Sequence, residues 1–402
     1  MRLLSRAARR RAPHVRCGAH VLLLGEWNQT QRDLRKGVER FGAALSDGYL
    51  QRDHDAVFDP AKWSQVCDSG VVALPFEQRY GGLGQDLLTT MYVLEGLGQT
   101  CRDGGLSFCV TTHIVSTGVP LQRFGSEQLK ARYLPGVCTG ATIGCHAITE
   151  PAAGSDALAM RTTATRAADG YRLDGSKTFV SNAPIAELFV VYARTDPAGG
   201  PLGITAFLVQ RDTPGLTVGA PIAKMGLKSA PLAELFFDGC VVPAANVIGG
   251  VGAGFLVLDY VMKREILCSF IVNVGEAEHR LEQVRAYAKS REQFGRPIGS
   301  FQAVANRIVD MHIAIETARM WLYRSAERMS QGKDATIDVA ISKLLASEAN
   351  LASALSAVQL FGGNGYMAEY GLEMQLRNAV GGTIYSGTSD IQRNRIAAML
   401  GL

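Results

Sequence analysis

Tyr171-Arg-Leu-Asp-Gly-Ser-Lys-Thr-Phe-Val180 is the stretch that decides the fold class, because it has the composition of a β-strand in a chain otherwise patterned as helices. Similar short runs of aliphatic, β-branched and aromatic residues, separated by turn signals, follow at Leu188–Tyr192, Ile204–Val209 and Leu235–Phe237. We therefore predict an antiparallel, β-barrel-like middle domain over residues 141–250.

Helical periodicity flanks this β region on both sides. Before it, apolar residues recur at spacings of three and four: Leu34, Val38, Phe41 and Leu45. This pattern predicts a helical N-terminal domain over residues 26–140. After it, long helical patterns resume and are interrupted at Gly362-Gly363, which predicts a C-terminal four-helix bundle domain over residues 251–402. The predicted fold class is α+β, with three units in the order helical, β, helical.

Composition excludes several broad classes of protein. Apolar residues make up 47% of the chain and charged residues 19%, so the chain can bury enough surface to fold. The eight cysteines form no Cys-x-x-Cys pair, which argues against a disulfide framework or a zinc site and favours a reducing compartment. No metal is expected. The apolar runs are shorter than the roughly 18 residues of a membrane-spanning helix, so no membrane insertion is expected.

Residues 1–25 differ in charge from the rest of the chain. Six arginines precede the first acidic residue, Glu26, and without them the net charge of +4 becomes 4 − 6 = −2. The rest of the chain therefore lacks the positive charge typical of nucleic-acid binding. A mitochondrial transit peptide is one interpretation. However, the extension holds one Ser, and Arg outnumbers Lys 31 to 10 in the whole chain. We favour a bacterial, cytoplasmic protein whose extension adds nothing to the folded core, with the mitochondrial matrix as the alternative.

Five motifs, in the same order along the chain, resemble those of the acyl-CoA dehydrogenase family from about Trp27 onward. They are Ile148-Thr-Glu-Pro-Ala-Ala-Gly-Ser-Asp156, Lys224-Met-Gly-Leu-Lys228, Arg291-Glu-Gln-Phe-Gly-Arg-Pro297, Leu360-Phe-Gly-Gly-Asn-Gly-Tyr366 and Ile384-Tyr-Ser-Gly-Thr-Ser-Asp-Ile-Gln-Arg393. Each is weak evidence alone, but five in the family's order are not a chance match. The resemblance implies an FAD-dependent oxidoreductase that introduces a 2,3 double bond into an acyl thioester of coenzyme A or acyl carrier protein.

The first motif has a chemistry of its own. Thr149, Gly154 and Ser155 supply two hydroxyls and exposed backbone amides, which suit phosphate or flavin oxygens, although an ordinary polar turn has the same composition. By resemblance, Thr149 and Ser155 bind FAD, Phe179 stacks on the isoalloxazine ring, and Ser181 lies at its N5. The family commonly has Trp and Thr at these two positions, so Phe keeps the stacking surface and Ser keeps the hydroxyl.

The third motif has two interpretations. Arg291, Gln293 and Phe294 lie where a helix is expected to end, with Gly295 as the residue after its C-terminus, so capping is one account. By resemblance, this segment instead reaches the FAD of a neighbouring subunit, since an Arg can donate two hydrogen bonds to phosphate. The resemblance adds three cofactor-binding residues: Gln359, Gly363 and Thr388. It also implies a homotetramer and an electron-transferring flavoprotein as electron acceptor.

The catalytic base is the main departure from better-known members, which have Glu where this chain has Ser386. A minority of the family supplies the base from the first helix of the C-terminal domain, and alignment through Gly254-Phe255 and Gly275 places Glu265 there. Neighbours three, four and seven positions from Glu265 are apolar or small, so the carboxylate lies on an apolar stripe, where burial strengthens a base. We predict that Glu265 removes the α-proton while hydride passes to flavin N5. The backbone N–H of Ser386 is expected to stabilise the thioester oxygen.

Three alternatives stay open at this point. Lys263, Arg264 or another cation of the helical bundle could neutralise Glu265, which would then be an ordinary structural acid. Relatives with this Glu usually have Arg directly after it, whereas this chain has Ile266. The protein could also be a flavin-dependent monooxygenase of the same fold, or a non-catalytic FAD-binding protein that interacts with an acyl carrier.

Several other reactive or aromatic residues are expected to belong to the core. His113 and His146 lie in apolar or strand-like contexts, which favours satisfied core histidines over acid–base groups. Cys145 and Cys268 lie among small and apolar residues and are expected to be inert buried thiols. The pair Phe236-Phe237 is also expected in the core.

Overall fold

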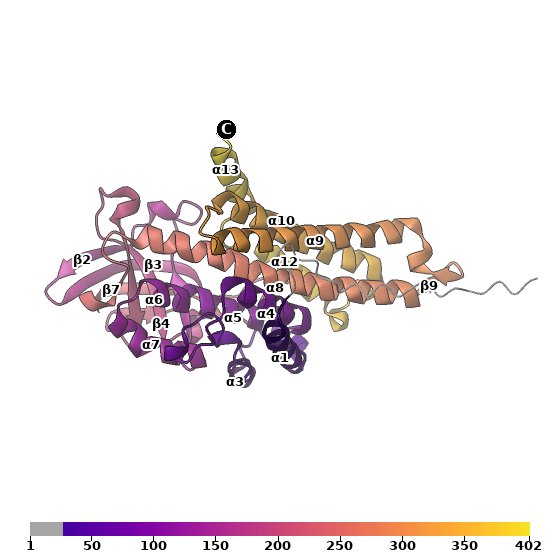
Figure 1. Cartoon of the computed structure of the whole chain (residues 1–402), viewed down its shortest axis with the longest axis horizontal. Coiled ribbons are helices and arrows are strands. Elements are labelled where there is room, and N and C mark those ends of the chain that lie inside the picture. The colour runs from indigo at the N-terminus through magenta and orange to yellow at the C-terminus, as the bar shows by residue number, and fades with distance from the viewer. Residues whose placement is uncertain (1–26) are drawn as a thin grey trace, which may run out of the picture.

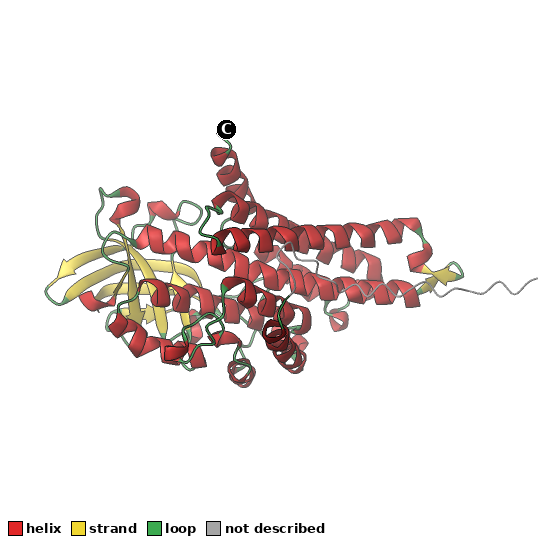
Figure 2. Cartoon of the chain, in the orientation of Figure 1, coloured by secondary structure: helices red, strands yellow, loops and turns green. Residues whose placement is uncertain are grey.

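A computed structural model describes residues 27–402, so the prediction for residues 1–25 lies outside the described residues. A helical N-terminal region, a β region and a helical C-terminal region follow one another along the chain, which confirms the predicted fold class. The β region lies at one end of the molecule, and the long helices of the C-terminal region extend away from it (Figures 1 and 2).

The N-terminal region contains seven α-helices in the described part of the chain. They are α1 (Gln29–Leu45), α2 (Tyr49–Asp55), α3 (Pro60–Asp68), α4 (Leu87–Thr100), α5 (Gly104–His113), α6 (Val119–Phe124) and α7 (Glu127–Thr139). Polar side chains cap the starts of five of them: α1, α3, α4, α5 and α7. Asn28 accepts a hydrogen bond from the backbone of Gln31 at 3.0 Å, and the Gln31 side chain accepts one from the backbone of Asn28 at 2.9 Å, which forms a capping box. The Asp86 side chain caps α4 by accepting a hydrogen bond from the backbone N–H of Thr89 at 2.7 Å.

The β region is an eight-stranded sheet. Its strands are β1 (Gly144–Ala147), β2 (Thr163–Ala167), β3 (Gly170–Ser181), β4 (Leu188–Arg194), β5 (Ile204–Gln210), β6 (Leu216–Val218), β7 (Leu232–Pro243) and β8 (Val247–Ile248). The order is β6-β7-β3-β2-β4-β5-β8, with β1 beside β4. Most pairs are antiparallel as predicted, but β1 runs parallel to β4, and β2 meets β4 in parallel. The antiparallel prediction missed these pairings, because the paired residues lie 44 positions apart in β1 and β4 and 31 positions apart in β2 and β4.

The two faces of the sheet pack against different cores. Alternate side chains of β4 point to opposite faces, so Val190 joins the core shared with the helices and Val191 joins a second core within the β region. The same alternation corrects the prediction for Phe236-Phe237. Phe237 is buried, but Phe236 is 43% exposed, because neighbouring residues of β7 face opposite sides.

The C-terminal region is built on one long helix. Its helices are α8 (Gly254–Ser290), α9 (Gln302–Ser330), α10 (Thr336–Phe361), α11 (Gly363–Tyr366), α12 (Leu372–Gly382) and α13 (Ser389–Met399), and a hairpin of β9 (Glu292–Gln293) and β10 (Arg296–Pro297) follows α8. α10 is long and apolar enough to cross a membrane by length and composition alone. It packs against α8, α9, α12 and α13, as the central helix of a bundle does.

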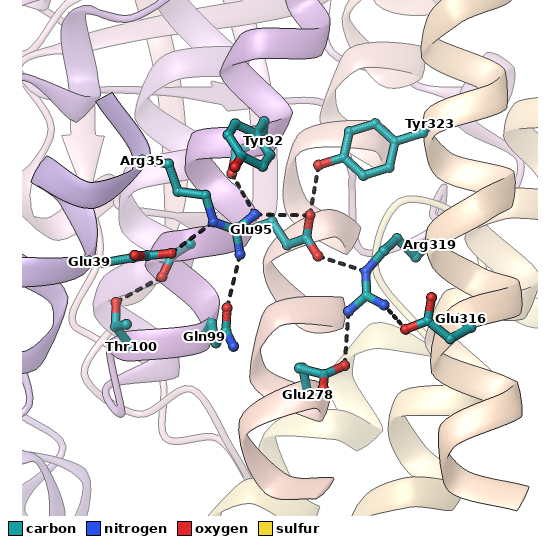
Figure 3. A network of polar contacts seen from close by, with 11 residues as sticks. Arg35, Glu39, Tyr92, Glu95, Gln99, Thr100, Glu278, Glu316, Arg319 and Tyr323 are labelled. Atoms are coloured by element: carbon teal, nitrogen blue, oxygen red, sulfur yellow. Dashed lines mark hydrogen bonds and ion pairs between the residues drawn. The ribbon is translucent and has the colours of Figure 1, made fainter. Parts of the chain in front are cut away.

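Helices α4 and α8 pack closely and join the two helical regions. A Cβ atom at Gly98 would lie 2.1 Å from the carbonyl oxygen of Val272, so only glycine permits this approach. Beside this contact, the buried carboxylate of Glu95 accepts hydrogen bonds from Arg319 at 2.7 Å, from Tyr323 at 2.7 Å and from Arg35 at 3.4 Å (Figure 3). These partners come from α1 and α9, so one carboxylate links three helices.

Candidate active site

Glu265 lies on α8 where that helix faces the sheet, and its side chain is 15% exposed. The hydroxyl of Ser386 donates a hydrogen bond of 2.6 Å to Oε1 of Glu265. His146 Nε2 lies 3.2 Å from the other carboxylate oxygen, Oε2. These two atoms are close enough for a hydrogen bond but are not aligned for one. The structure therefore brings together the two predicted catalytic residues and adds a third group.

Ser386 is held in an unusual backbone conformation between α12 and α13. Its φ of +55° lies in the left-handed region, which costs a non-glycine residue about 1 kcal/mol or more. The buried side chain of Gln392 stabilises this turn by donating to the carbonyl of Ser386 at 3.0 Å. The neighbouring Tyr385 ring packs between Phe108 and Phe270. Ser386 thus projects its hydroxyl at Glu265 from a rigid support.

The prediction that His146 is a satisfied core histidine was wrong. His146 lies on β1 opposite Val190 of β4, on the sheet face that packs against the helices. Its Nδ1 is buried and has no hydrogen-bond partner among the described residues. Burial lowers the pKa of His146, although the charge of Glu265 acts to raise it, so the ring is neutral at pH 7. His113, in contrast, fits the prediction: it contacts the carbonyl of Val137 at 2.9 Å.

Tyr192 belongs to the same polar cluster. It lies on β4 two residues after Val190, so it shares the sheet face of His146. Its hydroxyl is buried and has no hydrogen-bond partner among residues 27–402. Burial and the charge of Glu265 both raise the pKa of Tyr192 above its ordinary value. A neutral ring and a neutral phenol therefore face the carboxylate from the sheet.

No lysine or arginine in the described part of the chain forms an ion pair with Glu265. Lys263 pairs with Asp259 at 2.7 Å. The guanidinium of Arg264 lies 3.4 Å from the ring centre of Tyr260 and donates to that residue's carbonyl. The interpretation of Glu265 as a neutralised structural acid therefore loses both of its proposed partners.

The first group of predicted flavin-binding residues lies beside this cluster. The backbone N–H of Thr178 donates to the carbonyl of Thr149 at 2.8 Å, which joins the segment after β1 to the end of β3. The ladder between β3 and β7 shifts register between Lys177 and Val180, and within this bulge Phe179 takes a φ of +55°. Its ring is 64% exposed.

Ser181 and Ser155 complete this first group. Ser181 ends β3 and is half-buried, and Ser155 is exposed in the turn after Glu150. An exposed aromatic ring with hydroxyls nearby fits the face of a flavin, because the ring can stack while the hydroxyls donate or accept. The residues present therefore fit FAD.

The second group lies at the far end of α8, and its local structure corrects one prediction. Gly295 does not follow the helix C-terminus. Instead, Phe294 and Gly295 have φ values of +52° and +76° and form the turn of the β9–β10 hairpin. Phe294 is 94% exposed, and Arg291 and Gln293 are exposed beside it.

The remaining predicted cofactor residues lie elsewhere in the C-terminal region. Gln359 is exposed near the end of α10, and Gly363 is exposed at the start of α11. The side chain of Thr388 accepts a hydrogen bond from the backbone of Ile391 at 3.2 Å, so it caps α13. None of these three residues contributes to the cluster around Glu265.

A cavity of about 420 Å³ lies on a neighbouring face of α8. Tyr260, Arg264 and Cys268 line it, but Glu265 does not. Arg264 is about 100° around the helix from Glu265, which explains why the carboxylate points elsewhere. Burial raises the pKa of the Cys268 thiol to about 12, as expected of an inert buried thiol.

Comparison with known proteins decides the family. The models of the acyl-CoA dehydrogenase N-terminal, middle and C-terminal domains match residues 28–141, 145–240 and 252–401. The chain belongs to the acyl-CoA dehydrogenase family. It is 42% identical to L-prolyl-[peptidyl-carrier protein] dehydrogenase of Pseudomonas fluorescens, over 87% of this chain and 92% of the relative. It is 35% identical to the short-chain specific acyl-CoA dehydrogenase of Megasphaera elsdenii, over 90% and 95%.

Solved structures agree with this assignment. The prolyl acyl carrier protein oxidase AnaB has a TM-score of 0.92 at 41% identity, covering 94% of this chain and all of that one. Butyryl-CoA dehydrogenase from Megasphaera elsdenii has a TM-score of 0.90 at 33% identity, with the same coverage. The predicted family and fold are confirmed, and so is the function of an FAD-dependent acyl thioester dehydrogenase, an oxidoreductase that acts on CH–CH bonds.

Proposed function

We propose that Glu265 is the base that removes the α-proton of the acyl thioester. The observation that carries this proposal is a carboxylate on α8 that accepts a 2.6 Å hydrogen bond from Ser386 and has no described lysine or arginine partner. Because no lysine or arginine pairs with this carboxylate, accepting the α-proton breaks no ion pair. His146 beside Glu265 is three residues from Thr149, a span of at most about 11 Å. The base therefore lies close to the proposed flavin site.

Ser386 supports the proposed reaction in two ways. Its hydroxyl holds Oε1 of Glu265, and its backbone N–H donates to no acceptor in the described part of the chain. We assign that N–H to the thioester oxygen, whose negative charge grows as the α-proton leaves. FAD, when bound, supplies the acceptor for the hydride of the β-carbon. Thr149, Ser155, Phe179 and Ser181 would hold it on the adjacent face.

The proposed substrate is a small amine-bearing acyl group, such as prolyl, on a carrier protein. Its support comes from the relatives named for prolyl carrier proteins at 41–42% identity. One turn beyond Glu265, the cavity lined by Phe108, Ser269 and Tyr385 measures only about 10 Å³, which is room for about one water and opposes a long acyl chain in that direction.

Anaerobic reduction of the flavin tests this substrate. Prolyl, butyryl and decanoyl thioesters, each on coenzyme A and on a phosphopantetheinylated carrier protein, would be mixed with the enzyme and the loss of flavin absorbance followed. We expect prolyl carrier protein to reduce the flavin fastest and decanoyl thioesters to be inert. Equal reduction rates for all acyl groups would contradict the proposal.

We further propose that the enzyme is a homo-oligomer, most simply a tetramer, whose FAD sites lie between subunits. Glu265 and the end of α8 at Ser290 are 25 residues apart, about 38 Å along the helix, so the β9–β10 hairpin cannot reach the same chain's Phe179 site (Figure 1). The exposed Phe294 and Arg291 of that hairpin therefore suit the FAD of another copy. Flavin absorbance should show a lower FAD content in Arg291→Ala and Phe294→Ala than in the wild type. Sedimentation of the wild type gives its oligomeric state, and a monomer with full FAD occupancy would refute the proposal.

An electron-transferring flavoprotein is the proposed acceptor, as implied by the family, and the cytoplasm is the proposed location, as for a bacterial enzyme. Stoichiometric reduction of an added electron-transferring flavoprotein by enzyme and substrate would test the first point. Fast reoxidation of the reduced enzyme by air, with no need for that partner, would favour an oxidase instead.

A further inference from the structure

His146 is a half-buried titratable group beside Glu265, and the reaction outlined above does not use it. Its Nε2 lies 3.2 Å from Glu265 Oε2, on the side of the carboxylate opposite Ser386. The two groups come from different regions of the chain, β1 and α8, so their approach is a property of the tertiary fold. A polar ring packed into this sheet face costs free energy unless it has a partner.

The partners of the two ring nitrogens fix the tautomer. Nδ1 is buried and has no partner among the described residues. A proton on Nδ1 would leave a buried donor unsatisfied and would point the Nε2 lone pair at a carboxylate oxygen, which repels it. A proton on Nε2 instead faces a negative charge. The neutral Nε2–H form is therefore favoured.

We propose that His146 is a positioning residue for the base: its Nε2–H faces Oε2 of Glu265, stabilises the ionised carboxylate, and keeps it ready to accept the α-proton. This inference rests on the proposed role of Glu265. The imperfect alignment in the free protein is expected, because hydrogen bonds at a catalytic site often tighten when substrate binds. Ser386 and His146 then hold one carboxylate oxygen each.

The other groups that face Glu265 keep their charge state near neutral pH. Tyr192 on β4 and Tyr385 before Ser386 are neutral phenols, because burial raises the pKa of both. The Cys268 thiol one turn along α8 has a pKa of about 12. Arg264 remains a cation against the Tyr260 ring. The proposal therefore concerns Glu265 and His146, the two groups joined by the 3.2 Å contact.

Two isosteric variants test the proposal. His146→Gln places an amide nitrogen near the position of Nε2 and keeps the donor to Glu265. His146→Asn places its amide near Nδ1 and leaves Oε2 without a donor. The measurement is the pH dependence of kcat/KM for anaerobic flavin reduction, whose rising limb reports the base of the free enzyme.

For His146→Asn, we expect the pKa of the rising limb to increase by about one pH unit, the effect of losing one hydrogen bond to a charged group. The rate should fall about tenfold at low pH and approach that of the wild type well above the new pKa. His146→Gln should follow the wild-type profile. FAD content and melting temperature of both variants serve as controls for folding.

Two results would overturn the proposal: an unchanged rising limb in His146→Asn, or an equal loss at every pH in both variants, which a purely structural histidine would give. If both variants lose FAD, His146→Phe and Tyr192→Phe provide the same comparison, because Tyr192→Phe removes a polar group from this face without removing the donor to Glu265. Failure of the base assignment is a separate result, since Glu265→Gln would then still reduce flavin at a normal rate.

Discussion

Glu95 and Glu265 are carboxylates on the packed helices α4 and α8, the first buried and the second half-buried, and their surroundings are opposite. Glu95 is 2% exposed and accepts hydrogen bonds from two arginines and a tyrosine (Figure 3). Glu265 accepts a hydrogen bond from Ser386 and lies beside a neutral histidine, with no described lysine or arginine in contact. Glu95 thus joins the two helical regions, whereas Glu265 is free of ion pairs with lysine or arginine among the described residues and is available for chemistry.

The difference lies in which charges surround each carboxylate. A buried charge needs a compensating charge or hydrogen bonds, and removal of one partner of a buried ion pair is strongly destabilising. Arg319 shows this coupling: burial alone would lower its pKa, but the carboxylates of Glu95, Glu316 and Glu278 raise it above the ordinary value. Glu265 has dipoles around it instead, so it can change its protonation state without leaving a buried cation unpaired.

The largest expected effect is on chemistry, in Glu265→Gln. This change keeps the size of the side chain and removes the proton acceptor, so anaerobic flavin reduction by a good substrate should fall by about 10²- to 10⁴-fold. Stability should change by less than about 1 kcal/mol, because no ion pair is lost. Stopped-flow absorbance and urea unfolding measure the two quantities. If Glu265→Gln still binds FAD and its flavin is reduced at a near-normal rate, Glu265 is not the base.

The matching change in the other carboxylate, Glu95→Gln, should act on stability. It leaves Arg35 and Arg319 with fewer buried anions, which should cost about 3–5 kcal/mol in the free energy of unfolding. Reduction per FAD-containing molecule should stay close to that of the wild type. Urea unfolding alongside the same kinetic assay checks this. A stable but inactive Glu95→Gln protein would show that Glu95 acts in the reaction and not in stability.

Much of this contrast could be predicted from the sequence, and the missing part is tertiary. Helical periodicity placed Glu265 on an apolar stripe, and the motif around Ser386 pointed to the same site. His146 was predicted to be a core residue, because the strand pattern indicates that its side chain is buried. The pattern does not indicate that Glu265, 119 positions later, lies beside it. The hairpin at Phe294 was missed because a glycine after a helical pattern is also the usual sign of a helix end. Here Gly295 and Phe294 both have positive φ and form the hairpin turn instead.

A smaller effect should come from Tyr323→Phe, which removes one of the hydrogen bonds to Glu95, 2.7 Å long. The two arginines remain, so we expect a loss of about 1.5–2 kcal/mol in unfolding free energy, less than in Glu95→Gln. The difference in urea midpoint between the two variants measures how much of the network depends on charge. A loss in Tyr323→Phe as large as that in Glu95→Gln would mean that the hydroxyl, and not the ion pairs, dominates.

The smallest effect is expected from Ser386→Ala, which removes the hydrogen bond to Oε1 of Glu265 but leaves the backbone N–H in place. The carboxylate loses one stabilising donor, so the pKa of the rising limb of kcat/KM should increase by up to about one pH unit. The rate should then fall no more than about tenfold, and only below that pKa. Ser386→Gly is the matched control, because glycine also lacks the hydroxyl but adopts the φ of +55° without strain. The same shift in both variants would assign the effect to the hydroxyl, whereas a loss in Ser386→Ala that Ser386→Gly restores would assign it to the backbone.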